Sequence, residues 1–143
     1  MARPPRRSLT VTRQALELCR RYPHAERPTV RADRLRWIVK LQPTPFSVTY
    51  TVRVNHVTGH RPRVIIVDPA LHAPEGRKLQ HVFPGDELCL YYDEFDARVD
   101  LLADTIVPWI SEWLYFYEVW LTTDEWHGGG IHPTTETKSR RRR

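Results

Sequence analysis

The sequence has no long hydrophobic run, and this shortage limits where the protein can reside. It contains no stretch of about 18 consecutive apolar residues, the length that a membrane-spanning helix requires. The first residues, Met1-Ala2-Arg3-Pro4-Pro5-Arg6-Arg7, are basic, but a polar segment follows where a secretory signal would have its apolar core. We therefore expect a cytoplasmic protein with no membrane partner.

Cysteine is also scarce, with Cys19 and Cys89 the two present. They could form one disulfide at most, and without a secretion signal we expect both to be reduced. Cys19 lies beside the apolar stripe of an expected helix and is best explained as a small buried side chain. Cys89 follows a long irregular segment, which is the setting in which reactive cysteines usually occur.

Positive charge is concentrated at the two ends of the sequence. The whole sequence has a net charge of +5. Eight positive charges lie near its ends, at Arg3, Arg6, Arg7, Lys138 and residues 140–143. Without these eight, the rest of the sequence has a net charge of −3. This distribution predicts that the basic character belongs to the tails and that the folded surface is not basic. We accordingly expect no specific nucleic-acid partner, because such domains carry their charge on one face of the fold.

Hydrophobic periodicity predicts an α+β fold in a chain of 143 residues, the size of one domain. Helical patterns cover residues 8–22 and 103–121, and in the second the position of Pro108 places the helix start near Thr105 or Ile106. Strand-like patterns cover residues 35–41, 46–57 and 64–67, and their short links predict an antiparallel meander. We expect a flexible N-terminus over 1–7, one domain over 8–134 and a disordered basic tail over 135–143.

The residues around Cys89 suggest two interpretations. His81 lies eight positions upstream, near enough for the chain to turn back and bring an imidazole to a nucleophilic thiol. A cysteine in the short apolar run Leu88-Cys89-Leu90-Tyr91-Tyr92 can equally be a core residue. Spacing alone leaves both possibilities open.

The run Gly128-Gly129-Gly130 predicts a loop with unusual backbone angles or a close backbone contact. With the preceding His127 it resembles the oxyanion loop of esterases, but the sequence has no Gly-x-Ser-x-Gly elbow and is too short for that fold. Cys89, His81, His127 and His132 have metal-donor side chains but not the spacing of a zinc site. We expect no metal and no cofactor.

Several separated motifs in the second half carry a family resemblance. They are Leu88-Cys89-Leu90-Tyr91, residues 103–109, Glu112-Trp113-Leu114 with Tyr117-Glu118 and Trp120, and residues 126–133. In this order they resemble the stand-alone E2-like (ubiquitin-conjugating-type) proteins of bacterial anti-phage CBASS operons, in the short form without an E1 partner. The resemblance covers roughly residues 81–133.

The resemblance implies an E2-like fold: an N-terminal helix, an antiparallel meander of three to four strands, an irregular active-site segment and a C-terminal Trp-rich helix. Cys89 would take the place of the catalytic cysteine and His81 that of a preceding histidine. The partner would be the C-terminus of a cyclic-oligonucleotide synthase (CD-NTase), to which Cys89 would form a thioester. We expect substrate contacts from the Gly-rich loop, at Gly128, Gly129, Gly130 and His132.

Two departures from the family pattern affect the loops around the thiol. Residues 92–95 lack an expected proline, and residues 122–125 replace a more Gly-like turn.

The alternatives to a transferase are a non-catalytic module that docks the synthase and a small Cys–His hydrolase. The hydrolase is the weaker of these, because no third orienting group is evident.

Overall fold

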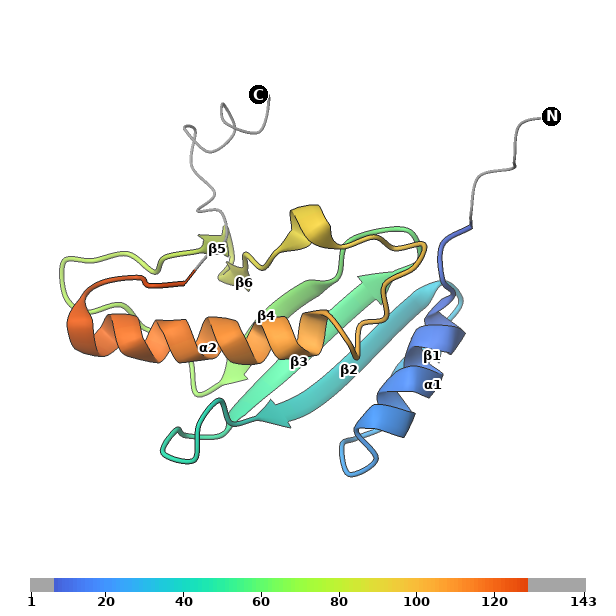
Figure 1. The fold of residues 1–143 in the computed structure, drawn as a ribbon, viewed down its shortest axis with the longest axis horizontal. Helices are drawn as coiled ribbons and strands as arrows, with labels where there is room; N and C mark the ends of the chain where they lie inside the picture. The colour runs from blue at the N-terminus through green and yellow to red at the C-terminus, as the bar shows by residue number, and fades with distance from the viewer. Residues whose placement is uncertain (1–6, 129–143) are drawn as a thin grey trace, which may run out of the picture.

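The computed structural model describes residues 7–128, in which two helices lie in front of an antiparallel sheet (Figure 1). The four-stranded sheet has the order β1-β2-β3-β4, with β1 at Thr29–Arg31, β2 at Arg34–Leu41, β3 at Tyr50–Val57 and β4 at Arg63–Asp68. Helix α1 covers Val11–Arg21, and helix α2 covers Ile106–Thr123. A two-residue pair, β5 at Val82–Phe83 and β6 at Glu87–Leu88, and the 3₁₀ turn η1 at Tyr92–Glu94 lie between β4 and α2.

The sheet buries one face, because burial alternates along its two long strands. Inward side chains of β2 and β3 form the core with α2, whose buried residues include Ile110, Leu114 and Trp120. This arrangement confirms the α+β fold and the antiparallel meander, which has four strands. The second helix begins at Ile106, as the position of Pro108 predicts.

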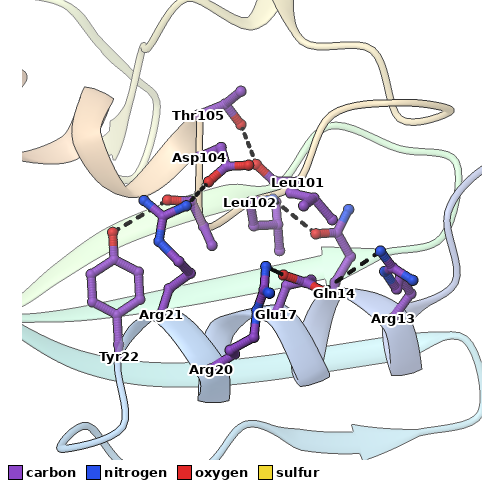
Figure 2. A network of polar contacts seen from close by, with 11 residues as sticks. Arg13, Gln14, Glu17, Arg20, Arg21, Tyr22, Leu101, Leu102, Asp104 and Thr105 are labelled. Atoms are coloured by element: carbon purple, nitrogen blue, oxygen red, sulfur yellow. Dashed lines mark hydrogen bonds and ion pairs between the residues drawn. The ribbon is translucent and has the colours of Figure 1, made fainter.

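Helix α1 is joined to the segment before α2 by polar contacts (Figure 2). The fully buried Gln14 side chain donates from Nε2 to the Asp100 carbonyl (3.0 Å) and accepts at Oε1 from the Leu102 amide (2.8 Å). Arg21 forms an ion pair with Asp104 at the other end of α1. Because these contacts link residues more than 80 positions apart, they define how the N-terminal helix docks.

One strand prediction is partly wrong. The expected strand over 46–57 begins only at Tyr50, and the side chains of Phe46 and Val48 are 98% and 56% exposed. The segment before Tyr50 folds as a loop, because Thr44 and Ser47 bond to one another and Gln42 donates to the Ser47 carbonyl (2.8 Å). These local side-chain bonds compete with strand pairing.

A partly buried carboxylate attaches this β2–β3 loop to α2. Glu118 accepts hydrogen bonds from the Ser47 hydroxyl (2.6 Å) and from the Tyr50 hydroxyl (2.8 Å). Burial and the Glu118 carboxylate raise the pKa of Tyr50 well above its ordinary value. Tyr50 therefore remains a neutral donor that connects the start of β3 to the helix.

Candidate functional site

The segment carrying Cys89 is a small hairpin, a feature that sequence periodicity did not reveal. In the register of this hairpin, Val82 is opposite Leu88 and Phe83 is opposite Glu87. One further bond continues the ladder, because the Cys89 amide donates to the His81 carbonyl (2.9 Å). The chain thus places Cys89 directly opposite His81 at the end of the hairpin, so the eight-residue spacing does bring their backbones together.

His81 has a special backbone conformation and serves as a junction. Its φ of 53° lies in the left-handed region, which few residues other than glycine adopt. Its carbonyl accepts a second bond from the Trp113 indole N–H (3.1 Å), which joins the hairpin to α2. One carbonyl oxygen therefore sets the position of the Cys89 strand relative to the helix.

The His81 imidazole faces an aromatic partner. It stacks on Trp126, with ring centroids 4.6 Å apart and planes 23° from parallel. The side chain is 8% exposed, so the histidine is largely shielded from solvent. Its stacking connects the hairpin to the segment that follows α2.

Cys89 itself is 4% exposed. Around it lies a group of side chains that we call the Cys89 enclosure, formed by Leu90, Tyr91, Trp109, Trp113, Phe116 and Trp126. The free volume inside is about 10 Å³, which is at the lower limit for one water molecule. The thiol is therefore covered in this conformation.

The C-terminal side of the enclosure depends on Gly128. A Cβ atom built at Gly128 would lie 2.7 Å from Phe116 Cγ and 2.9 Å from Trp126 Nε1, so any other residue here would displace an aromatic ring. The first glycine of the Gly-rich loop thus lies against two walls of the enclosure. Gly129, Gly130 and His132 lie outside the described residues.

Trp126 is held in the enclosure by ring contacts. Its ring centroid is 5.3 Å from that of Trp113 and 6.4 Å from that of Phe116. Its indole N–H is buried and has no hydrogen-bond partner within the described part of the chain. Among residues 7–128, the indole is therefore held over the thiol by ring packing and not by a hydrogen bond from its N–H.

A tyrosine and a carboxylate lie at the rim of the enclosure. The Tyr91 hydroxyl donates to Glu112 Oε1 (3.1 Å), and its ring packs edge-on against Trp109. Burial and the nearby Glu112 carboxylate raise the pKa of Tyr91 above its ordinary value. Tyr91 is therefore a neutral hydrogen-bond donor, and the sequence pointed to it only through the family resemblance.

The hairpin is also attached to β4 through Glu87, whose role sequence reasoning missed. This carboxylate is 5% exposed and forms ion pairs with Arg61 (3.4 Å) and Arg63 (3.2 Å). Arg61 also lies over the Phe83 ring, 4.3 Å from its centroid. No spacing pattern marks a glutamate in an irregular segment as buried, so only the fold reveals this anchor.

Within residues 7–128, no three His, Cys, Asp or Glu side chains gather as metal ligands would. Neither of the helices described there is both long and apolar enough to cross a bilayer. The enclosure itself is formed by the thiol and aromatic walls, and the His81 imidazole stacks on one of those walls, Trp126.

Comparison with known proteins gives one family. The family model described as type II CBASS E2 protein matches residues 14–133, a span that includes most of α1, the sheet, the Cys89 hairpin and all of α2. No curated protein matches the chain at a significant level. The family match and the α+β fold with its four-stranded antiparallel sheet agree with one another. The chain therefore belongs to the family of type II CBASS E2 proteins and has a role in CBASS defence.

Proposed function

We propose that this protein is an acyl carrier that forms a thioester between Cys89 and the C-terminal carboxyl group of a cyclic-oligonucleotide synthase (CD-NTase), in the cytoplasm. The observation that carries the proposal is the position of Cys89 in a member of the CBASS E2 family. Its backbone is held opposite His81 at the end of a hairpin that is attached to both the sheet and α2. Rigid placement of a nucleophile lowers the entropic part of the barrier to attack.

The reaction has two balanced steps. In the first, the Cys89 sulfur attacks a carboxyl carbon already activated as a thioester. The new C–S bond forms, the old one breaks, and the departing thiol takes up the proton that Cys89 loses. In the second, an amine attacks the Cys89 thioester, the C–S bond breaks with return of a proton to sulfur, and an amide remains. The synthase is thereby conjugated and primed.

Burial of Cys89 adds a requirement to this chemistry. A thiol that is 4% exposed cannot meet a protein C-terminus until a wall of the enclosure moves. Trp126 is the wall best suited to move, because within the described residues its indole makes ring contacts and no hydrogen bond, and it lies near the end of the described range. We assign the Gly-rich loop, including Gly128, Gly129, Gly130 and His132, to contact with the incoming substrate when Trp126 moves.

His81 is proposed to act on the thiol in two ways. Its carbonyl positions the Cys89 strand, and its imidazole is the proposed acid–base partner of the sulfur once Trp126 leaves the ring face. The variant H81N tests the second role, because asparagine tolerates a left-handed φ and keeps the carbonyl. We expect a lower rate of adduct formation. An unchanged rate would show that His81 acts only through its main chain.

The central experiment is intact-mass analysis of the protein incubated with its operon's synthase, whose C-terminus is supplied as a chemically prepared thioester because the short form of these operons has no E1 partner. We expect a covalent adduct that free thiols release. C89A should form none, and C89S should form an adduct that thiols do not release. C19A is the matched control and should behave as the parent does. An identical adduct on C89A would show that the proposal is wrong.

The burial of Cys89 favours a second candidate function, a non-catalytic module that docks the synthase with Cys89 as a core residue. Two measurements separate the candidates: the rate of Cys89 alkylation in the presence of the synthase, and phage defence by C89S. Slow alkylation together with full defence by C89S would support docking. Alkylation that the synthase accelerates, together with loss of defence, would support transfer.

A further inference from the structure

The outer face of the sheet, which points away from the two helices, carries an unusual concentration of arginines. Residues opposite one another in the register share a face, so Thr29, Arg36, Asn55 and Arg63 form one row across the four strands. Arg31 and Arg34 form part of the adjacent row, and Arg53 lies between Ile38 and Ile65 in the next. We call this surface the arginine face; it comprises Arg31, Arg34, Arg36, Arg53 and Arg63 with Arg61 at its edge.

Most of this charge is not neutralised. Within the described chain, Arg31, Arg34, Arg36 and Arg53 have no acidic partner within ion-pair distance, and the Arg53 Nε is buried without a hydrogen-bond partner. Asp33, in the turn between β1 and β2, pairs with none of them. Arg31 and Arg34 are directly opposite one another, an arrangement of like charges that destabilises a sheet. Folding gains nothing from this arrangement, so a ligand is the better explanation.

The arginine face is also hollow. Its concave part encloses about 760 Å³ and is lined by five arginines and no carboxylate. Asn55, Thr29 and His60 add further polar groups to the lining. Guanidinium groups present paired N–H donors that match the oxygen pairs of phosphates and carboxylates. The site is therefore built for an anion with several charges.

From these features we infer that the arginine face binds the phosphate backbone of a nucleic-acid duplex. Side chains two apart on a strand are about 7 Å apart, close to the spacing of successive phosphates. No outward position of β1 to β4 is aromatic. These strands therefore offer no ring on which the bases of a single strand could stack. Phosphate contacts without base contacts give binding that depends on salt and not on base sequence.

This inference is independent of the acyl-transfer proposal, and it corrects the interpretation of charge drawn from the sequence. The part of the chain between the basic ends has a net charge of −3, yet the charges there are segregated, with arginines gathered on one face. A net charge averages over the surface and conceals such a patch.

The test is fluorescence anisotropy of the full-length protein with a labelled DNA duplex of about 20 base pairs, between about 50 and 200 mM salt. The variant R31Q/R34Q/R36Q removes three exposed charges from the arginine face, and R141Q/R142Q/R143Q removes three from the C-terminal tail as a charge-matched control. We expect the face variant to bind at least about tenfold more weakly at low salt, with a salt slope shallower by about 2 to 3. The tail variant should change the affinity and the salt slope less than the face variant does.

Circular dichroism and melting should show that the face variant is folded, because all three positions are exposed. The single strand of the same sequence should bind more weakly than the duplex. Three outcomes would overturn the inference: a face variant that binds as the parent does, a tail variant that loses more than the face variant, or displacement of the duplex by poly-glutamate at equal charge concentration. The last would show that the face binds acidic protein segments.

Discussion

At the scale of single residues, Gly128 controls how closely Trp126 covers Cys89. We predict that G128A pushes Trp126 off the enclosure, because the added methyl group would overlap Phe116 and Trp126. Alkylation of Cys89 should then be at least about tenfold faster than in the parent, since reaction of a buried thiol follows its accessibility. Mass spectrometry after a timed pulse of iodoacetamide measures this rate.

The control for this prediction is G76A, at a glycine whose φ of 79° strains an alanine but where a built Cβ atom meets nothing within 4 Å, so it tests backbone strain without a clash. It should leave the alkylation rate of Cys89 unchanged. If G128A protects the thiol as well as the parent does, Trp126 is not the mobile wall.

His56 offers a second test at this scale, through pH. It is 2% exposed, packs edge-on against Phe95, and neither ring nitrogen has a hydrogen-bond partner within the described residues. Burial, with a smaller effect of His60, lowers the pKa of His56 to about 4. Because the unfolded chain takes up this proton at a higher pH, the stabilisation is complete above about pH 6.5 and is lost as pH falls toward 4.

We predict that the parent loses on the order of 2 kcal/mol of unfolding free energy between pH 7 and pH 4.5 through His56 alone. H56L, which cannot take up a proton, should lose that much less over the same range, as measured by urea unfolding. H60L is the control, since His60 is exposed and should leave the pH dependence nearly unchanged. Equal pH dependence in H56L and the parent would contradict the prediction.

Sequence reasoning reached some of the site residues and not others, for physical reasons. The eight-residue gap between His81 and Cys89 allowed a turn, and the hairpin supplies it. The stacking of His81 on Trp126 and the burial of Glu87 join segments distant in sequence, and no local pattern encodes them. The functional roles of Cys89, His81 and the Gly-rich loop stay predictions.

At the scale of elements, the docking of α1 depends on one buried amide. We predict that Q14A destabilises the protein by about 2 to 4 kcal/mol, because it leaves the Leu102 amide and the Asp100 carbonyl without a partner. Chemical denaturation measures the change. L16A is the control on the same helix, since Leu16 is 62% exposed and should cost less than about 0.5 kcal/mol. A comparable loss in both variants would mean that the bonds of the buried amide are not the cause.

Helices were predicted more accurately than strands. The stripe of the second helix is periodic over many residues, and Pro108 marks its first turn, so its start was placed correctly. The strand β1 has three residues and the pair β5–β6 has two residues on each side, which is too short for any periodicity to show. The apolar Phe46 and Val48 suggested a longer strand, but hydrogen bonds among Gln42, Thr44 and Ser47 hold them in a loop.

At the scale of the whole molecule, charge is distributed unevenly, and this should affect stability. We predict that R31Q/R34Q/R36Q is more stable than the parent by about 0.5 to 1 kcal/mol at low salt, because it removes the repulsion between opposed arginines. The difference should shrink near 1 M salt, where charges are screened within about 3 Å. Thermal melting at several salt concentrations measures it.

The tail variant R141Q/R142Q/R143Q is again the matched control, with the same change in net charge. It should melt as the parent does at every salt concentration. If both triple variants gain stability equally, net charge and not the opposed pair is the cause. Weaker duplex binding and higher stability in the same face variant would mean that the arginines that bind the duplex also destabilise the folded sheet.

The two bonds to the His81 carbonyl determine which residues position 81 can accept and which experiment can remove one of these bonds. Because the bonds to Cys89 and Trp113 are made by the main chain, replacing the side chain at position 81 does not remove them. Substitutions at position 81 would therefore overlook this junction and detect only the need for a residue that accepts a left-handed φ, such as asparagine or glycine. An ester in place of the Cys89 amide, made by chemical synthesis or ligation, would delete the N–H donor while leaving every side chain in place.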